Sequence, residues 1–160
     1  MKKNINTILL SILSLSILSI FSAYFIEYGL GHKPCKLCLY QRYPYFLSVI
    51  FILSIFFTKK YIKLSLLMLA LISFLGSILA FYHVGIEQGF FNESFVCEAK
   101  NLDPNLSKED VLKQLSEKTV SCKNVTFRIF GLSLATINTI FSFALFGIFI
   151  KLYRNYETNK

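Results

Sequence analysis

Four cysteines are the residues of this chain best suited to chemistry, and they fall into two groups. Cys35 and Cys38 form a Cys-x-x-Cys motif, whereas Cys97 and Cys122 lie far apart in a later segment. A Cys-x-x-Cys motif is typical of either a redox-active pair or half of a zinc site. The later cysteines could complete four zinc ligands, but they lack the short spacing of a second zinc-binding half-site. The motif alone leaves redox chemistry, a structural disulfide and metal binding open.

Basic residues surround the Cys-x-x-Cys motif. Lys33, Lys36 and Arg42 lie within a few positions of it, and nearby positive charge favours the thiolate form of cysteine. If a helix begins near Cys38, Arg42 follows four positions later and lies on the same helical face. We therefore expect a Cys38 thiolate beside a guanidinium group, placed to attack an electrophile dissolved in lipid. The alternative for Arg42 is an ordinary basic anchor at a membrane surface.

The spacing of Cys97 and Cys122 fits two different uses. A disulfide between them would close a long loop and stabilise it by about 3 to 4 kcal/mol as a static clamp. A mobile catalytic pair could have the same spacing. We favour the catalytic use, because two exposed pairs beside each other make a thiol–disulfide relay possible.

Long stretches without charge predict that membrane-spanning helices position these cysteines. Three stretches carry no Asp, Glu, Lys or Arg: residues 4–26, 64–86 and 129–150. Each exceeds the roughly 20 residues that cross a bilayer. A fourth stretch, 43–58, gives only about 24 Å of helix, so a span there must begin near Cys38 and include Arg42. We expect Pro44 to kink this helix or to delay its start.

The sequence predicts an all-α membrane protein, a bundle of four transmembrane helices in a single domain, residues 1–160. The expected spans are residues 5–26, 39–58, 64–85 and 130–150, and the cysteine-bearing loops are residues 27–38 and 86–129. A hydrophobic content of 54% agrees with this class. A cleaved signal peptide is the alternative for the first span, but the apolar run is too long and Phe21–Tyr24 is a poor cleavage site.

Lysine and arginine predict the orientation of the bundle. Basic residues gather at both termini and between the second and third spans: Lys2, Lys3, Lys59, Lys60, Lys63, Lys151, Arg154 and Lys160. This side is expected to be cytoplasmic, because short cytoplasmic loops are enriched in Lys and Arg. Both cysteine loops then face the exported, oxidising side. The net charge of +8 follows from these flanking residues, so no nucleic-acid partner is expected.

Two motifs together resemble the family of disulfide bond formation protein B, DsbB. The first is Pro34–Arg42, PCKLCLYQR, and the second is Phe81–Glu87, FYHVGIE, at the end of the third span. The later cysteine pair and the segment 130–133, FGLS, before the last span fit the same family. The resemblance covers nearly the whole chain.

The resemblance implies a protein of the bacterial inner membrane that oxidises a DsbA-like, thioredoxin-like periplasmic protein and reduces ubiquinone or menaquinone. It implies that Cys35 and Cys38 form the pair coupled to the quinone, with Cys38 nearest to it. Cys97 would form the mixed disulfide with the partner and Cys122 would resolve it. Arg42 would be the cation at the quinone.

The resemblance also places His83 near the quinone, with no metal in the site. Glu87 follows His83 by four positions and could orient it. The alternatives are an interfacial histidine without a catalytic role and a solvated loop acid.

Three other functions remain open from the sequence. They are a membrane protein that handles metal through four thiolates, a structural subunit with disulfide-clamped loops, and a thiol oxidase similar to vitamin K epoxide reductase. A further expectation concerns Ser107–Lys118. Its apolar positions lie on one helical face and a capping box begins it, so we expect a short helix along the outer membrane surface.

Overall fold

The computed structural model of the chain describes residues 2–58, 61–92, 121–123, 127–129 and 131–158. Four stretches within these residues are helical, long and apolar enough to cross a membrane: Ile5–Gly29, Lys36–Thr58, Ile62–Glu87 and Leu134–Tyr156. The fold is therefore the predicted all-α bundle with four spans. Cys97 and the expected helix at Ser107–Lys118 lie outside the described residues.

The first span is a helix, α1 (Lys2–Tyr24), that continues into one wider π-helical turn, η1 (Phe25–Gly29). It ends where Gly31 adopts a φ of 71°, a left-handed conformation that glycine takes without steric cost. The span is several residues longer than the predicted 5–26. The added turn carries Glu27 into the bundle, where it lines a cavity.

The second span is broken into two helices, α2 (Lys36–Tyr40) and α3 (Tyr43–Thr58). Cys35 caps α2, because its sulfur accepts a hydrogen bond from the backbone N–H of Cys38 at 3.3 Å. Pro44 falls in the first turn of α3, where a missing N–H leaves no intrahelical bond unmade. The interruption expected around Pro44 is present, and it takes the form of a turn at Gln41 and Arg42.

The third span, α4 (Ile62–Glu87), ends in a tight backbone turn. The carbonyl of Gly85 accepts from the N–H groups of Phe90 and Phe91 at 2.8 and 3.1 Å, and Gly89 has a φ of 79°. A Cβ on Gly85 would overlap the ring of Phe91, so the close return of the chain depends on glycine here. The turn fixes the last residues of α4, which include His83 and Glu87.

The last span, α6 (Leu134–Thr158), starts later than the predicted residue 130. A short antiparallel pair, β1 (Arg128–Ile129) and β2 (Leu132–Ser133), occupies the preceding residues, with Arg128 opposite Ser133. Ser133 Oγ then accepts from the Thr136 N–H at 3.1 Å, which is the geometry of a helix N-cap. The hairpin and the cap together delay the helix.

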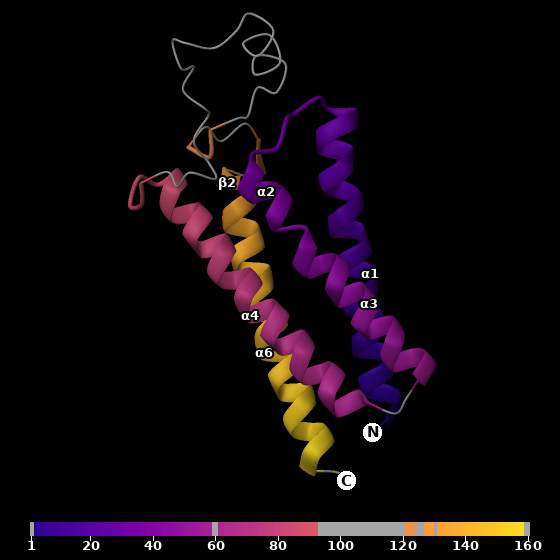
Figure 1. The fold of residues 1–160 in the computed structure, drawn as a ribbon. Helices are drawn as coiled ribbons and strands as arrows, with labels where there is room; N and C mark the ends of the chain where they lie inside the picture. Colours follow the sequence, from indigo (N-terminus) through magenta and orange to yellow (C-terminus); the bar gives the residue numbers. More distant parts are fainter. Residues whose placement is uncertain (1, 59–60, 93–120, 124–126, 130, 159–160) are drawn as a thin grey trace, which may run out of the picture.

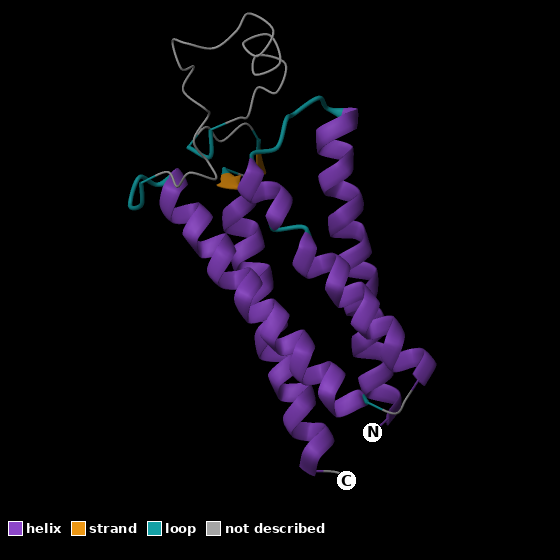
Figure 2. Cartoon of the chain, viewed as in Figure 1, coloured by secondary structure: helices purple, strands orange, loops and turns teal. Residues whose placement is uncertain are grey.

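The four spans run antiparallel, so both termini lie at one end of the molecule and α2, β1 and β2 lie at the other, here called the loop end (Figures 1 and 2). Helix α4 packs most extensively on α6, and α3 packs on both α1 and α4. The main apolar core lies toward the terminal end and includes Leu9, Ile52, Leu66 and Phe149. At the loop end, the interior of the bundle is more polar.

The outward surface of the helices is apolar. Large hydrophobic side chains are exposed on every span, among them Leu10, Phe21, Ile50, Phe57, Leu64, Leu75, Ile140 and Phe143. A soluble bundle would place polar residues at these positions, because a monomer in water seldom exposes continuous apolar surface. Their exposure agrees with helices that face lipid.

Candidate active site

The Cys-x-x-Cys pair lies at the loop end, at the start of α2. Cys35 and Cys38 are free thiols, and their sulfur atoms lie 2.9 Å apart. This distance fits a thiol that shares its proton with a thiolate, and it exceeds the S–S bond length of about 2.05 Å. A small movement of either sulfur would allow the pair to form a disulfide.

Cys35 is the sulfur that this arrangement stabilises as an anion. Its Sγ accepts from the Cys38 backbone N–H and lies 3.5 Å from His83 Nε2. The hydrogen bond from the Cys38 thiol, helped by His83 and opposed by burial, lowers the pKa of Cys35 from 9.0 to about 4. The sequence led us to expect the thiolate at Cys38, so here the structure reverses the expected assignment.

His83 lies on the inner face of α4 and is 2% exposed. Its Nδ1 lies 2.9 Å from Gln41 Nε2, and its Nε2 lies 3.7 Å from a carboxylate oxygen of Glu87. The side chain of Glu87 is only 7% exposed, and its second oxygen, Oε2, has no hydrogen-bond partner. The view of Glu87 as a solvated loop acid is therefore wrong.

Cys122 lies beside the first pair, although 87 positions separate it from Cys35 in the sequence. The ligand atoms of Cys35, His83 and Cys122 all lie within 4.8 Å of one another, and Cys122 is 2% exposed. Cys122 is disulfide-bonded. Its predicted partner, Cys97, lies outside the described residues, so that pairing stays a prediction.

One imidazole and two sulfur atoms so close together also raise the alternative of a metal site. A cysteine binds zinc as a negatively charged thiolate, however, and a sulfur within a disulfide carries no negative charge. With Cys122 oxidised, the three residues therefore fit thiol–disulfide exchange better than metal binding.

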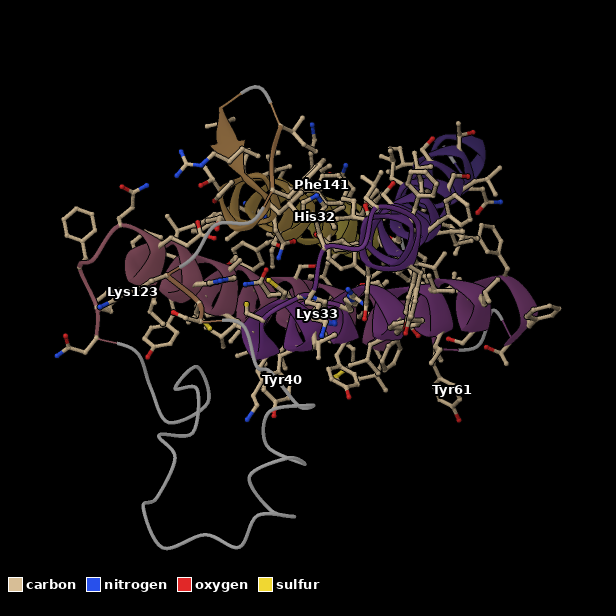
Figure 3. The ribbon with its side chains drawn as sticks, turned by 90° about the horizontal axis from the view of Figure 1, so that it is seen from above. His32, Lys33, Tyr40, Tyr61, Lys123 and Phe141 are labelled. Carbon is tan, nitrogen blue, oxygen red and sulfur yellow. The ribbon has the colours of Figure 1, made fainter. Side chains whose placement is uncertain are left out.

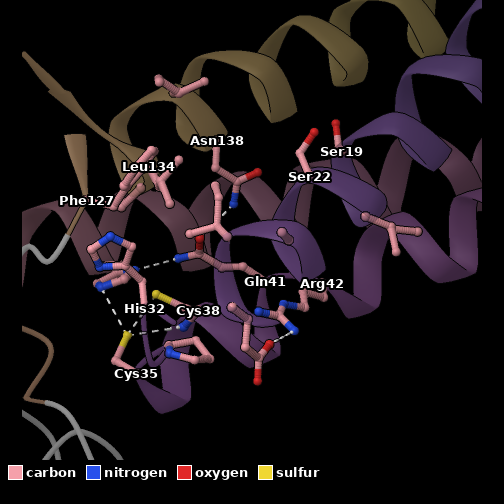
Figure 4. A pocket seen from close by; sticks show the side chains of 18 of the residues that line it. Ser19, Ser22, His32, Cys35, Cys38, Gln41, Arg42, Phe127, Leu134 and Asn138 are labelled. Atoms are coloured by element: carbon pink, nitrogen blue, oxygen red, sulfur yellow. Dashed lines mark hydrogen bonds and ion pairs between the residues drawn. The ribbon is translucent and has the colours of Figure 1, made fainter. Parts of the chain in front are cut away.

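A cavity of about 390 Å³ opens beside the sulfur atoms. Cys35, Cys38, Gln41, Arg42 and Asn138 surround it in the close view, together with apolar side chains of α1 and α6 (Figure 4). Seen from above, His32 and Lys33 lie toward the middle of the molecule (Figure 3), and both line the cavity. The size and the mixed lining suit a small, largely apolar ligand with a few polar atoms.

A family comparison bears on this arrangement of cysteines. The family model described as Disulfide bond formation protein DsbB matches residues 5–152. The chain belongs to the DsbB family. It is therefore a multi-pass membrane protein with disulfide oxidoreductase activity that takes part in disulfide bond formation.

Among curated proteins, the chain is similar to the uncharacterized protein RP370 of Rickettsia prowazekii (strain Madrid E). The two are 28% identical over 154 residues, which cover 94% of this chain and 89% of that protein. No solved structure matches the chain.

In this DsbB-family chain Arg42 was expected beside a Cys38 thiolate, but its charged partner in the structure is Glu27. Its guanidinium forms an ion pair of 2.6 Å with Glu27 of η1 and lies over the ring of Tyr24, 4.8 Å from the ring centre. The turn at Gln41 and Arg42 ends α2 before Arg42, so Arg42 and Cys38 do not share one continuous helical face. Both side chains nevertheless line the same cavity.

Three polar residues of this site, Gln41, Asn138 and Tyr45, were not predicted from the sequence. Asn138 Nδ2 donates to Gln41 Oε1 at 2.8 Å, and the Tyr45 hydroxyl donates to Asn138 Oδ1. Gln41 belongs to the family-like segment around the cysteines, which could have drawn attention to it. Asn138 could have been noticed as an amide within a charge-free apolar run, because polar side chains inside the membrane are costly and usually have a role.

Proposed function

We propose that this chain oxidises the dithiol of a DsbA-like periplasmic protein and passes the electrons through its two cysteine pairs to ubiquinone or menaquinone. The observation that carries the proposal is the closeness of Cys122, Cys35 and His83, whose ligand atoms lie within 4.8 Å of one another. A sulfur from the second cysteine loop is thus within reach of the Cys-x-x-Cys pair.

The relay needs four exchanges. A thiolate of the reduced partner attacks Cys97 in a Cys97–Cys122 disulfide, which forms a mixed disulfide and releases Cys122 as a thiolate. Cys122 then attacks Cys35 in the oxidised Cys35–Cys38 pair, and the bond that breaks releases Cys38. The partner's second thiolate attacks the mixed disulfide and releases Cys97, and Cys97 attacks Cys122 and releases Cys35. Each exchange forms one S–S bond and breaks one, so the partner leaves oxidised and its two electrons end on the first pair.

Ionisation of the Cys35 sulfur supports this direction of transfer. A sulfur whose pKa is low leaves a disulfide readily, and the environment of Cys35 lowers its pKa. Cys35 is the sulfur released in the last exchange, when Cys97 attacks Cys122, so the stabilised Cys35 anion favours that step. His83 Nε2, 3.5 Å from the sulfur, can hold the hydrogen bond throughout.

The residues of the cavity fit a quinone. The cavity volume of about 390 Å³ and its apolar walls suit a substituted ring. Arg42 and His83, which line the cavity, offer N–H groups for the two carbonyl oxygens. A bound quinone would accept the two electrons of the dithiol together with two protons. The chain would hold it with Arg42 and His83.

We place the chain in the bacterial inner membrane with both termini in the cytoplasm and the cysteines facing the periplasm. Lys63, Lys151 and Arg154 lie at the terminal end of the bundle, as the positive-inside rule requires of a cytoplasmic side. The periplasm is also the compartment in which disulfides persist.

The deciding experiment is quinone reduction by the purified protein supplied with a reduced DsbA-like protein, with ubiquinone and menaquinone tested separately. Cys38→Ser should abolish quinone reduction. Cys122→Ser should lose turnover. Mixed with the oxidised partner, its free Cys97 thiolate should attack the partner's disulfide and trap a covalent adduct, because the resolving thiol is gone. The control is the Cys97→Ser/Cys122→Ser double variant, which should lose partner oxidation while Cys35 and Cys38 still exchange with a small dithiol. Normal turnover by Cys122→Ser would overturn the relay.

A further inference from the structure

A chain of hydrogen bonds crosses the bundle and ends at the reactive sulfur. It runs from Tyr45 on α3 to Asn138 on α6, then to Gln41 between α2 and α3, to His83 on α4, and finally to Cys35. The two contacts of Gln41, with Asn138 and with His83, are 2.8 and 2.9 Å, and the contact of His83 with Cys35 is 3.5 Å. Residues of α3, α6 and α4, far apart in the sequence, are thus joined in one chain.

The chain has a direction, because each amide presents its oxygen to one neighbour and its NH₂ group to the next. The Tyr45 hydroxyl donates to Asn138 Oδ1, and the Ser142 hydroxyl lies 3.4 Å from the same oxygen. With its oxygen so occupied, Asn138 turns its NH₂ group toward Gln41 Oε1. Gln41 must then turn its own NH₂ group toward His83.

An amide nitrogen can donate a hydrogen bond and cannot accept one. Because Gln41 Nε2 faces His83 Nδ1 at 2.9 Å, Nδ1 must be the accepting nitrogen of the ring. A neutral imidazole has one donor and one acceptor, so its proton lies on Nε2. That N–H points to the side of the ring on which Cys35 lies, 3.5 Å away.

We propose that Asn138 is a positioning residue for the thiol chemistry, and that it acts through Gln41 to hold His83 as the neutral tautomer that donates from Nε2 to Cys35. Asn138 touches neither reacting sulfur in this role. The inference rests on the proposed use of Cys35 as a redox thiol, but it concerns the tautomer of His83, which exists without partner or quinone.

The arrangement also disfavours the other neutral tautomer. A ring protonated at Nδ1 would turn its N–H against the NH₂ group of Gln41, and Gln41 cannot rotate without breaking its bond to Asn138. With the proton on Nε2, the N–H group faces Cys35 at 3.5 Å and the carboxylate of Glu87 at 3.7 Å. The chain therefore favours the tautomer that donates from Nε2.

The test is ¹⁵N NMR of histidine-labelled protein in detergent, without quinone or partner. The chain has only two histidines, so a His32→Gln variant assigns the signals of His83. The protein with its natural sequence should show the tautomer protonated at Nε2. Asn138→Leu should shift the tautomer ratio by about five-fold or more toward Nδ1, which is the effect of losing one oriented hydrogen bond.

Thr139→Val is the matched control. Thr139 is the next residue of α6, and its hydroxyl donates to the backbone carbonyl of Ala135 in the same helix. This variant removes a hydroxyl without touching the chain, so it should leave the signals of His83 unchanged. Gln41→Leu should shift the ratio as Asn138→Leu does, and combining the two should add little, because both act through one path.

Two results would overturn the proposal. One is an Nδ1-protonated or doubly protonated His83 in the unsubstituted protein, a measurement that needs no variant to fold. The other is an Asn138→Leu spectrum identical to that of Thr139→Val. Failure of the quinone assay with the expected spectra would instead count against the proposed electron acceptor alone.

Discussion

The reactivity of the first cysteine pair is decided by which groups point at each sulfur. Cys35 Sγ receives a backbone N–H and shares the Cys38 proton, and it lies beside His83. A sulfur that accepts several hydrogen bonds holds negative charge at lower pH than a free thiol. The hydrogen bond from the Cys38 thiol, together with His83 and the backbone N–H of Cys38, thus selects Cys35 as the anion.

Replacing Cys38 should raise the pKa of Cys35. The hydrogen bond from Cys38 is the largest cause that lowers this pKa to about 4. With Cys38 present, Cys35 is ionised throughout pH 6 to 9, so its alkylation by iodoacetamide should be nearly independent of pH there. In Cys38→Ala the rate at pH 6 should fall about ten-fold below its value at high pH.

This comparison is made in a reduced Cys97→Ser/Cys122→Ser background, with the alkylated peptide identified by mass spectrometry. Burial of Cys35 raises its pKa and slows the reaction, but it does so with Cys38 present or replaced. Cys38→Ser should give an intermediate midpoint, because a hydroxyl also donates. A rate that is flat with pH in Cys38→Ala would show that Cys38 is not the cause.

Arg42 is predicted to contribute both to the stability of the protein and to quinone binding, and the two contributions can be measured separately. Arg42→Gln leaves Glu27 without its partner, which should destabilise the protein by about 1 to 3 kcal/mol, and it should raise the apparent KM for quinone about ten-fold. Arg42→Lys should retain part of the affinity.

The matched control is the Arg42→Gln/Glu27→Gln double variant. It removes both charges and should recover the stability, measured by thermal unfolding in detergent, without recovering quinone affinity. If Arg42→Gln alone has the quinone kinetics of the unsubstituted protein, Arg42 is only an anchor in the membrane interface.

At the scale of elements, the break between α2 and α3 needs a small residue on the facing helix. Pro44 at the start of α3 packs on Gly76 of α4, where an added Cβ would lie 3.2 Å from Pro44 Cγ. Ser73, Ser77 and Ala80 are buried on the same helix, which agrees with small residues at close helix contacts. The close approach of α3 to α4 brings Gln41 to His83.

Gly76→Leu should destabilise the protein by about 1 to 3 kcal/mol, because the larger side chain has no space against Pro44. Gly147→Leu is the matched control, since a Cβ on Gly147 of α6 would meet no atom within 4 Å. Unfolding in detergent measures both. Equal stability of the two variants would mean that the contact at Gly76 is not tight.

At the scale of the whole molecule, the bundle brings two cysteine loops together at the loop end. The sulfur of Cys122 lies within 4.8 Å of that of Cys35, while the spans α3 and α4 separate the two loops along the chain. Only antiparallel packing of the spans produces this meeting. The meeting is also what a relay between two pairs requires.

A Cys38→Ser/Cys97→Ser variant should form a Cys35–Cys122 disulfide in air. The two remaining sulfurs are near enough to bond after a small movement. Non-reducing gel mobility and mass spectrometry of the linked peptides measure it. The control, Cys35→Ser/Cys97→Ser, leaves Cys38 and Cys122 and should cross-link less. Equal yields would show that Cys122 is not held at Cys35 in particular.

The orientation of the bundle predicts the behaviour of reporter fusions. Both termini lie at the end of the bundle that carries Lys63, Lys151 and Arg154, so a C-terminal green fluorescent protein should fluoresce. Alkaline phosphatase fused at the same place should be inactive, because it folds only after export. An active phosphatase fusion would place the cysteine loops in the cytoplasm.

The sequence by itself determined the class of the molecule. The lengths of the charge-free stretches predicted four spans, and the motifs around Cys35 and His83 predicted the DsbB family; both predictions are confirmed. These features are local. Helix length follows from the number of consecutive apolar residues, and a motif is read from neighbouring positions.

The tertiary structure decided the partners of the functional side chains. It turned Arg42 toward Glu27, made Cys35 the stabilised sulfur, and joined Asn138 to His83 through Gln41. Each of these outcomes depends on residues from different helices or on the exact residue at which a helix stops. A one-residue change in that end point rotates the next side chain by about 100°, so no local pattern could have fixed it.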